Sequence, residues 1–420
     1  MNIKFKGKKV NSFSVIICIF LFINVLSHFL RFETDNIKYI SLMNAYSWII
    51  LFVLFIYKFI VKKVVISLKK LFLFCMLIIT TFLSWNLGQK YFENIFNYKS
   101  KLLIFLISIL ICYIGGWKEK LCLNDVIFIF KTIIFIGLVA VIFAFATQGQ
   151  LVLNVLTGMN KENSSWRFFS FFSQRNIYAQ YCFISCSACL ILHEITSKKI
   201  YIIFGVLFEF NILITDSQTS VYASAFLLLL YFYLKSKHKI FLFVISILIF
   251  VMIYINYLNG FDLSIISKHI DSKSGMDSGA MRLSMWSRGV GMLSSHNAWL
   301  QGFGDGSASE FLLRYYEYGS FHNAYMDVLF EGGLIRLVIL LGTLVNTIVM
   351  MLKSNLVFKN SYITFILSVC LIYFFESGSA IFMDNYFAIT TSLLVILLPR
   401  TLVFDVRHFG GDLGETIGCL

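Results

Sequence analysis

DVIFIFKTIIFIGLVAVIFAFAT, residues 125–147, is the stretch that decides the fold of this chain. It is long enough to cross the roughly 30 Å of hydrocarbon in a bilayer as an α-helix, and its interior holds one charged residue, Lys131. Comparable apolar runs recur along the 420 residues, of which 59% are hydrophobic and one is proline. Strands with open edges would leave backbone groups unpaired in lipid, and the alternation of a membrane barrel is absent. The sequence therefore predicts an all-α, polytopic membrane protein.

The apolar runs predict about twelve membrane-spanning helices, separated by mostly short connections. They lie near residues 12–30, 39–61, 71–87, 101–117, 125–147, 176–193, 200–215, 218–234, 239–258, 326–352, 361–376 and 380–399. A polar segment from Asn259 to Phe321 separates the ninth run from the tenth, and every other connection is shorter. We expect a membrane protein with one such long polar segment to carry out its function there.

The distribution of basic residues predicts the orientation. With the N-terminus in the cytoplasm, twenty Lys and Arg residues fall in cytoplasmic segments and eight fall in the short external connections. This ratio follows the positive-inside rule, so both termini are expected in the cytoplasm and the long segment outside. The net charge of +13 does not indicate a nucleic-acid partner, because the lysines form short clusters between spans and no basic stripe with interleaved aromatic residues is present.

This topology divides the chain into four parts. Residues 1–258 hold the first nine helices, 259–325 form a large external loop, 326–399 hold the last three helices, and 400–420 form a cytoplasmic tail. We predict that the loop is catalytic because it collects cationic side chains and a histidine outside the membrane: Arg282, Arg288, Arg314 and His322.

Several kinds of chemistry are excluded by missing signatures. The chain has no P-loop, no dinucleotide fingerprint and no His-Glu-x-x-His, and its external segments contain no Asp-x-Asp. Most of the nine cysteines lie in apolar spans; Cys182, Cys186 and Cys189 share a helix face, which we interpret as packing. No metal site and no cofactor are therefore expected.

Arginine and histidine outside the membrane suit group transfer from a diphosphate. A guanidinium donates paired hydrogen bonds to phosphate oxygens and stabilises the charge that builds on a leaving diphosphate, and histidine near pH 7 accepts a proton from an attacking hydroxyl. His322 is the first candidate, but His296-Asn297-Ala298-Trp299 resembles His322-Asn323-Ala324-Tyr325, and the residues alone leave both open. Arg282 and Arg288 fall in a predicted short helix over 278–294, about 120° apart around it, so one faces the site while the other anchors to lipid headgroups.

Further polar residues lie near the predicted external ends of other spans. Arg175 and Asn176 begin the sixth span, close enough to face a cavity. Asp216 lies in a polar break between the seventh and eighth spans, which we interpret as a turn. Glu376 and Asp384, in the final hairpin, are expected to be solvated.

Three stretches together resemble the O-antigen polymerase and O-antigen ligase superfamily. The first is Phe172-Ser173-Gln174-Arg175-Asn176-Ile177-Tyr178-Ala179. The second is Ala280-Met281-Arg282-Leu283-Ser284-Met285-Trp286, followed by Gln301-Gly302-Phe303-Gly304-Asp305-Gly306. The third is His322-Asn323-Ala324-Tyr325, followed by Glu331-Gly332-Gly333-Leu334. The number of spans and the position of the large loop also match the family pattern.

The resemblance implies a metal-independent glycosyltransferase of the multi-span GT-C kind, whose donor is a glycan on undecaprenyl diphosphate. It implies His322 as the base for the acceptor hydroxyl and Arg282 as the diphosphate ligand. The substrate-binding residues expected around them are Arg288, Arg175, Asn323, Asn176 and Arg314. One departure is Ser217-Gln218, where many members have Ser-Arg; Gln carries no charge, and Arg175 is a candidate to replace it.

The function expected on this ground is polymerisation of surface-polysaccharide repeat units, such as O-antigen or capsule, in the bacterial inner membrane. The partners are undecaprenyl diphosphate-linked glycans, membrane lipids and, by resemblance, a chain-length regulator. Two alternatives stay open. One is an O-antigen ligase that transfers polymer to lipid A-core or another surface acceptor. The other is a lipid-linked oligosaccharide flippase or transporter, for which charged or broken helices near the midplane and short external loops would be typical.

Overall fold

The computed structural model describes residues 2–5, 8–34, 38–92, 99–118, 120–157, 168–172, 174–215, 217–236, 279–316, 319–376 and 386–402. The ninth predicted span, the first part of the predicted loop and the tail from residue 403 lie outside these ranges. Within them the chain is mostly helical, as the sequence predicts.

Most of the described helices fall on predicted apolar runs. The helices are α1 (Ser12–Thr34), α2 (Lys38–Ile60), α3 (Leu68–Gly88), α4 (Lys99–Ile109), α5 (Leu123–Thr157), α7 (Arg175–Thr196), α8 (Ile200–Thr215), α9 (Gln218–Lys235), α12 (Gly279–Ser295), α13 (Ser307–Tyr316), α14 (Ala324–Leu352), α15 (Lys359–Phe375), α16 (Tyr386–Thr391) and α17 (Leu398–Thr401). Of these, α12 and α13 belong to the predicted loop, and α5 extends ten residues beyond its run. Two π-helical segments, η2 (Leu110–Ile114) and η3 (Ser392–Leu397), extend α4 and join α16 to α17. Three of the described helices, α3, α14 and residues 123–154 of α5, are long and apolar enough to cross a membrane, and the other apolar helices are shorter. The count of twelve spans stays a prediction.

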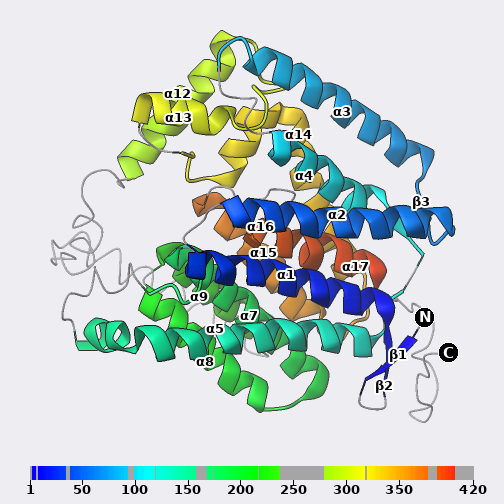
Figure 1. The fold of residues 1–420 in the computed structure, drawn as a ribbon, viewed down its shortest axis with the longest axis vertical. Helices are drawn as coiled ribbons and strands as arrows, with labels where there is room; N and C mark the ends of the chain where they lie inside the picture. The colour runs from blue at the N-terminus through cyan, green and yellow to red at the C-terminus, as the bar shows by residue number, and fades with distance from the viewer. Residues whose placement is uncertain are drawn as a thin grey trace.

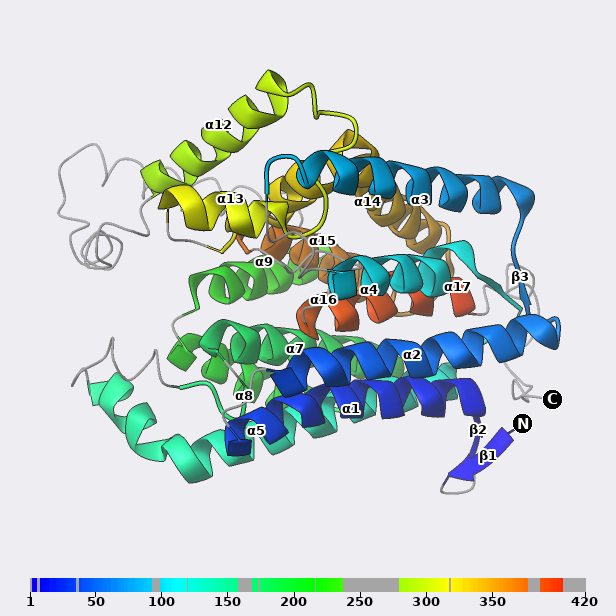
Figure 2. The ribbon, with the colours of Figure 1, turned by 45° about the horizontal axis from the view of Figure 1, so that its top comes forward.

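Two small antiparallel sheets supplement the helices. β1 (Asn2–Phe5) pairs with β2 (Lys8–Asn11), and β3 (Val64–Val65) pairs with β4 (Gly116–Trp117). The all-α prediction does not include them, because strands this short leave no alternating pattern in the sequence. β1, β2, β3 and α17 lie on the opposite side of the molecule from α12 and α13 (Figures 1 and 2).

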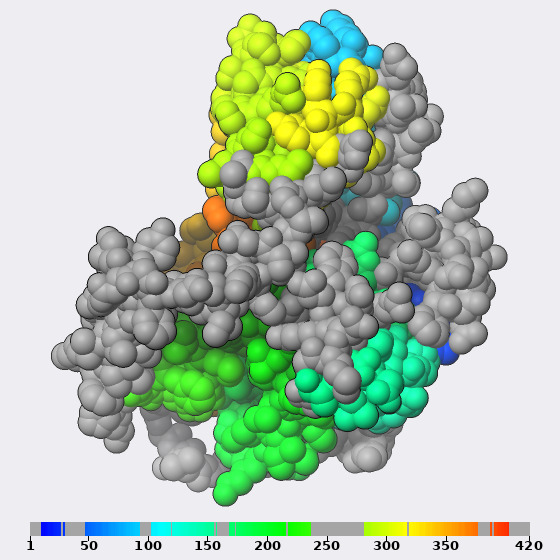
Figure 3. Space-filling model, turned by 90° about the vertical axis from the view of Figure 1, so that its left-hand side faces the viewer, coloured from blue at the N-terminus to red at the C-terminus, as the bar shows by residue number. Residues whose placement is uncertain are grey.

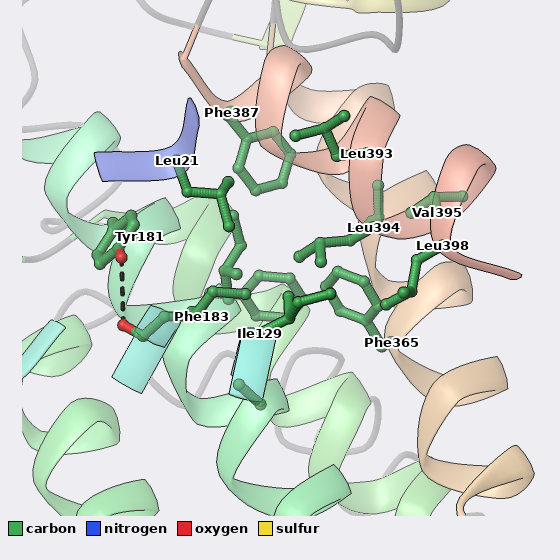
Figure 4. Close-up of a cluster of buried hydrophobic side chains, with 14 of the residues drawn as sticks. Leu21, Ile129, Tyr181, Phe183, Phe365, Phe387, Leu393, Leu394, Val395 and Leu398 are labelled. Carbon is green, nitrogen blue, oxygen red and sulfur yellow. Dashed lines mark hydrogen bonds between the residues drawn. The ribbon is translucent and has the colours of Figure 1, made fainter. Parts of the chain in front are cut away.

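The helical bundle is built around α7, which is buried along most of its length. Small residues permit close helix packing in a membrane protein: a Cβ added to Gly137 of α5 would lie 2.5 Å from the Ser185 hydroxyl of α7. Figure 4 shows Phe183 of α7 among side chains of α5, α15 and η3, with the Tyr181 hydroxyl donating to the Ile133 carbonyl at 3.2 Å. The bundle core therefore lies where α5, α7, α15 and η3 meet.

The outer surface of the bundle is apolar. Large hydrophobic side chains are exposed on α3, α5, α8 and α9, among them Phe72, Ile142, Val206 and Leu229. A soluble monomer rarely exposes apolar surface on this scale. Together with the three long apolar helices, this surface indicates an integral membrane protein.

The described part of the predicted loop is a folded layer with a core of its own. α12 and α13 contribute Met285, Leu293, Phe311 and Leu312 to a cluster that Phe92 and the first turns of α14 complete. α12 coincides with the predicted short helix within one residue, whereas α13 was not expected. We call this cluster the loop core. Figure 3 shows α12 and α13 together at one end of the molecule.

A break in α14 receives the segment between α12 and α13. Gly333 has a φ of +65°, which interrupts the helix. The Leu334 and Gly304 amides then donate across the break to the Trp299 and Glu331 carbonyls, both at 2.7 Å. Gly302 fits because a Cβ there would lie 2.6 Å from backbone atoms of the break. The two glycine-containing motifs of the sequence are thus brought into direct contact.

Candidate functional site

The ends of five bundle helices converge beside the loop core. α14 and α15 run antiparallel, since the Tyr325 hydroxyl in the first turn of α14 donates to the Cys370 carbonyl near the end of α15 at 3.0 Å. The first residues of α7 and α9 and the last residue of α8 lie beside the end of α15. Hydrogen bonds join the starts of α7 and α9 to Glu376, and another joins the start of α7 to the end of α8. We call the polar residues at these ends, together with Arg282 of α12, the candidate site: Arg175, Asn176, Thr219, His322 and Glu376.

Glu376 joins three helices at this site. Its Oε1 accepts hydrogen bonds from the Asn176 side-chain amide of α7 at 3.0 Å and from the Thr219 hydroxyl of α9 at 3.1 Å. The expectation that Glu376 is a solvated hairpin residue is therefore wrong. It is half-buried because the N-termini of α7 and α9 supply neutral donors to its carboxylate. Asp384 lies outside the described residues.

Arg175 is buried at the first position of α7, with 7% of its surface exposed. Its Nη1 is 3.4 Å from the Thr215 carbonyl at the end of α8. α8 ends at Thr215 and α9 begins at Gln218; Asp216, which we predict to lie in a turn, is outside the described residues. Thr219 was not singled out from the sequence, because a threonine next to a predicted turn carries no signal of its own.

His322 lies in a strained backbone conformation between two anchored residues. Its φ is +51°, and a left-handed conformation at a residue other than glycine costs about 1–3 kcal/mol. The Phe321 amide before it donates to Asp327 Oδ1 at 3.1 Å. Asn323 after it caps α14, with Oδ1 accepting from the amides of Tyr325 and Met326 at 2.9 and 3.1 Å. The backbone of His322 is thus held on both sides by its neighbours.

The cap assigns Asn323 a definite task. Its side chain is buried, and Oδ1 is occupied by backbone donors of its own helix. The sequence predicts Asn323 as a substrate ligand, and that role stays a prediction; the structure shows Asn323 as the cap of α14 directly after His322.

α12 is fastened beside His322 by Trp286. The indole Nε1 donates to the Phe321 carbonyl at 2.9 Å, and the ring meets Phe374 edge-on at 5.9 Å, two residues before Glu376. Arg282 precedes Trp286 by one helical turn and therefore lies on the same face of α12. Its side chain is half-buried. This face directs Arg282 toward the side of α12 that contacts the His322 segment.

Arg288 lies on another face of α12 and packs on α13. Its guanidinium is 4.6 Å from the ring centre of Tyr315 and 5.6 Å from that of Tyr316. Arg314, an exposed side chain, forms an ion pair with the mostly buried Glu310 at 3.8 Å. Arg288 and Arg314 therefore lie in the loop layer, and among the described residues no contact joins either of them to Glu376; their predicted role as substrate ligands stays a prediction.

His296 has a different environment from His322. Its ring meets Tyr91 at 4.4 Å and Phe303 at 5.9 Å, and Nδ1 lies 3.0 Å from the Met292 carbonyl one turn back in α12. These contacts fit a packing role in the loop core.

A buried ion pair that the sequence did not signal supports the loop. Arg336 of α14 binds Asp305 with Nη1–Oδ1 and Nη2–Oδ2 distances of 2.8 and 3.1 Å. Glu331 Oε1 accepts from the Gly306 amide at 2.8 Å. Over the ranges that the structure describes, no group of three or more His, Cys, Asp or Glu side chains is arranged to hold a metal ion.

One comparison with known proteins bears on this arrangement. Residues 202–341 match a family model described as O-antigen ligase. The matched range begins in α8, includes α12 and α13, and ends inside α14 beyond the break. No curated protein sequence matches this chain.

Proposed function

From the match of residues 202–341 to the O-antigen ligase family model, which supports the O-antigen polymerase and ligase superfamily, we propose that the chain polymerises the repeat units of a surface polysaccharide. The donor is a glycan on undecaprenyl diphosphate, and the acceptor is a sugar hydroxyl of a second lipid-linked unit. A role in surface-polysaccharide assembly follows from the family; the polymerase reaction and its substrates are the proposal.

The observation that carries the proposal is the fixed, left-handed His322 at the meeting point of α12, α14 and α15. A histidine at a neutral pH takes a proton when it is within reach of the reacting hydroxyl. The strain at His322 is retained because Asp327, Asn323 and Trp286 hold the segment on both sides. Strain maintained in this way is typical of functional sites.

The proposed step transfers one glycosyl group. The acceptor oxygen attacks the anomeric carbon of the donor sugar while the bond from that carbon to the diphosphate oxygen breaks. His322 takes the hydroxyl proton, and the diphosphate leaves on its carrier with the bonding electrons. Arg282 stabilises the leaving charge, because a fixed guanidinium interacts more strongly with it than with the bound donor.

The helix ends around Glu376 supply the remaining polar surface. Many members of the superfamily have Ser-Arg where this chain has Ser217-Gln218, and Gln218 carries no charge. Arg175 takes the place of that missing arginine in binding the diphosphate. Asn176, Thr219 and Glu376 fix the spacing of α7, α9 and α15 beneath the sugars. The apolar outer faces of α8 and α9 let the lipid carriers approach from the bilayer.

The test is complementation of a knockout host with wild type, His322→Ala or His296→Ala at matched expression, with surface glycan separated on a gel. Wild type and His296→Ala are expected to restore the polymer ladder, and His322→Ala is expected to leave single repeats. A normal ladder from His322→Ala would remove the proposed base.

The family description favours one second candidate, an O-antigen ligase. The same experiment separates the two reactions. Loss of a polymerase leaves single repeat units on the surface, whereas loss of a ligase leaves long polymer attached to its lipid carrier. Polymer stranded on the carrier in the knockout would replace polymerisation by ligation.

A further inference from the structure

Two cationic side chains converge on one carbonyl oxygen at the end of the molecule opposite α12 and α13. Lys70 Nζ, from the first turn of α3, lies 3.0 Å from the Tyr113 carbonyl oxygen, and Arg400 Nη1, from α17, lies 2.9 Å from the same atom. Lys70 Nζ and Arg400 Cζ also lie 5.7 and 4.3 Å from the centre of the Tyr113 ring. Figure 2 shows that α3, α4 and α17 approach one another in this region.

The residues that the structure describes do not balance the charges of this pair. Within the described ranges, neither Lys70 nor Arg400 forms an ion pair with a carboxylate. Arg400 Nε is buried and has no hydrogen-bond partner there. Two like charges this close repel each other strongly where water is scarce, and one carbonyl supplies only a partial negative charge. An anion between the two side chains would offset the repulsion between them and would give Arg400 Nε a hydrogen-bond acceptor.

Capping of a helix C-terminus does not account for both cations. Tyr113 lies in the last turn of η2, where one cation is favourable. A single lysine or arginine would serve that purpose. The second brings a repulsive charge that capping alone does not require.

The surroundings indicate where the anion comes from. Next to Lys70, α3 exposes Leu68, Leu71 and Phe72, which are 84%, 44% and 69% exposed. Lys63 and Lys118 are exposed on the same side, where the Lys118 amide donates to the Lys63 carbonyl at 2.9 Å. Basic residues above an apolar helix face match the headgroup and acyl chains of an anionic lipid. The basic-residue count predicts this end to be cytoplasmic.

We propose that Lys70 and Arg400 form a binding site for a phosphate group, and that an anionic phospholipid headgroup supplies it. Arg400 offers its planar fork to two phosphate oxygens, and Lys70 adds a point charge. The Tyr113 carbonyl oxygen accepts hydrogen bonds from both side chains and fixes their positions. The acyl chains of the lipid lie along α3. The site is separate from the candidate site and independent of the glycosyl transfer proposed there.

The test uses the purified full chain in a neutral detergent, with three probes: phosphatidylglycerol, phosphatidylcholine and inorganic phosphate. Native mass spectrometry counts bound lipid, and thermal unfolding measures stabilisation. The variants are Lys70→Gln/Arg400→Gln, the single Lys70→Gln, the conservative Lys70→Arg, and Lys198→Gln/Lys199→Gln, which removes two exposed charges between α7 and α8.

Wild type, Lys70→Arg and Lys198→Gln/Lys199→Gln are expected to bind phosphatidylglycerol and to unfold at a higher temperature with it. Lys70→Gln/Arg400→Gln is expected to bind it about thirtyfold more weakly, since each basic residue contributes about fivefold. With phosphatidylcholine alone, the single Lys70→Gln change should not lower the unfolding temperature, because it removes repulsion.

Each other outcome has a defined meaning. Equal phosphatidylglycerol binding by wild type and Lys70→Gln/Arg400→Gln overturns the site. A lower unfolding temperature of Lys70→Gln in every lipid, with lipid binding unchanged, overturns it in favour of capping. Inorganic phosphate could stabilise wild type but not Lys70→Gln/Arg400→Gln, while phosphatidylglycerol has no such effect. That result supports the phosphate site and overturns the lipid as its source.

Discussion

Arg336 and Asp305 lie 31 residues apart in the chain and form a two-point ion pair with nitrogen–oxygen distances of 2.8 and 3.1 Å. Their side chains are 6% and 11% exposed, and the Arg336 guanidinium also lies 4.3 Å from the ring centre of Phe105. The pair therefore ties the segment before α13 to α14 just beyond its break, and to α4. The position of the loop layer over the bundle depends on it.

Asp305→Ala is expected to destabilise the protein because it leaves the Arg336 charge buried without a partner. Breaking such a pair costs about 3–5 kcal/mol in the free energy of unfolding. Arg314→Ala is the matched control, since it breaks the ion pair with Glu310 at a side chain that is 49% exposed, and it should cost less than about 1 kcal/mol. Chemical unfolding in detergent micelles measures both. Equal losses in the two variants would show that the buried pair has no special role.

Gly333→Ala tests the break in α14. A Cβ at Gly333 would lie 2.2 Å from the Leu300 carbonyl oxygen, at a φ of +65°, so the variant should lose about 1–3 kcal/mol from backbone strain and more from the clash. Gly342→Ala, in the same helix with no atom within 4 Å of the added carbon, should be neutral or stabilising by up to about 1 kcal/mol. Unfolding temperatures of the two variants give the comparison. Similar temperatures would mean that the break is not required.

The helices were predictable from sequence because apolar runs of membrane length have one stable form in lipid. The break at Gly333 was not, since its glycine pair fits a continuous helix equally well until Leu300 and Gly302 are placed against it. The same holds for Arg336, which the sequence places inside an apolar span with no sign of its partner. Long-range pairing of this kind leaves no periodic pattern along the chain.

Trp286→Phe is expected to lower activity while the fold is retained. The change removes the hydrogen bond from Nε1 to the Phe321 carbonyl and keeps an aromatic ring against Phe374. A lost hydrogen bond of this kind costs about 0.5–1.5 kcal/mol, and it frees the segment that holds His322. The polymer ladder at matched expression should become shorter.

Trp299→Phe is the control for this change, because Trp299 Nε1 donates to the nearby exposed Ser294 hydroxyl at 3.2 Å. It should leave the ladder as in wild type. A ladder shortened equally by both variants would indicate a general loss of stability in the loop layer, and the link from Trp286 to His322 would be abandoned.

The candidate site was predictable in part. His322, Arg282, Arg175 and Asn176 could be singled out because their side chains carry recognisable chemistry at the ends of apolar runs. Glu376 was assigned to solvent, since a carboxylate at the end of a predicted span is usually hydrated and its donors, Asn176 and Thr219, are far away in sequence. The roles of Arg282 and His322 remain predictions that mutation can test.

Glu376→Ala tests whether this carboxylate holds three helix ends together. The variant leaves the Asn176 amide and the Thr219 hydroxyl without their acceptor, at a cost of about 1–3 kcal/mol in the free energy of unfolding. Glu376→Gln retains Oε1 as an acceptor for both donors and should keep most of the stability. Thr219→Val removes one donor with little change in shape. If Thr219 acts through Glu376, the double variant Thr219→Val/Glu376→Ala should lose less than the sum of the single losses, with a coupling of about 0.5–3 kcal/mol. Additive losses would mean that the two residues stabilise their helices separately, and the tie between α9 and α15 at the candidate site would then have to come from apolar packing alone.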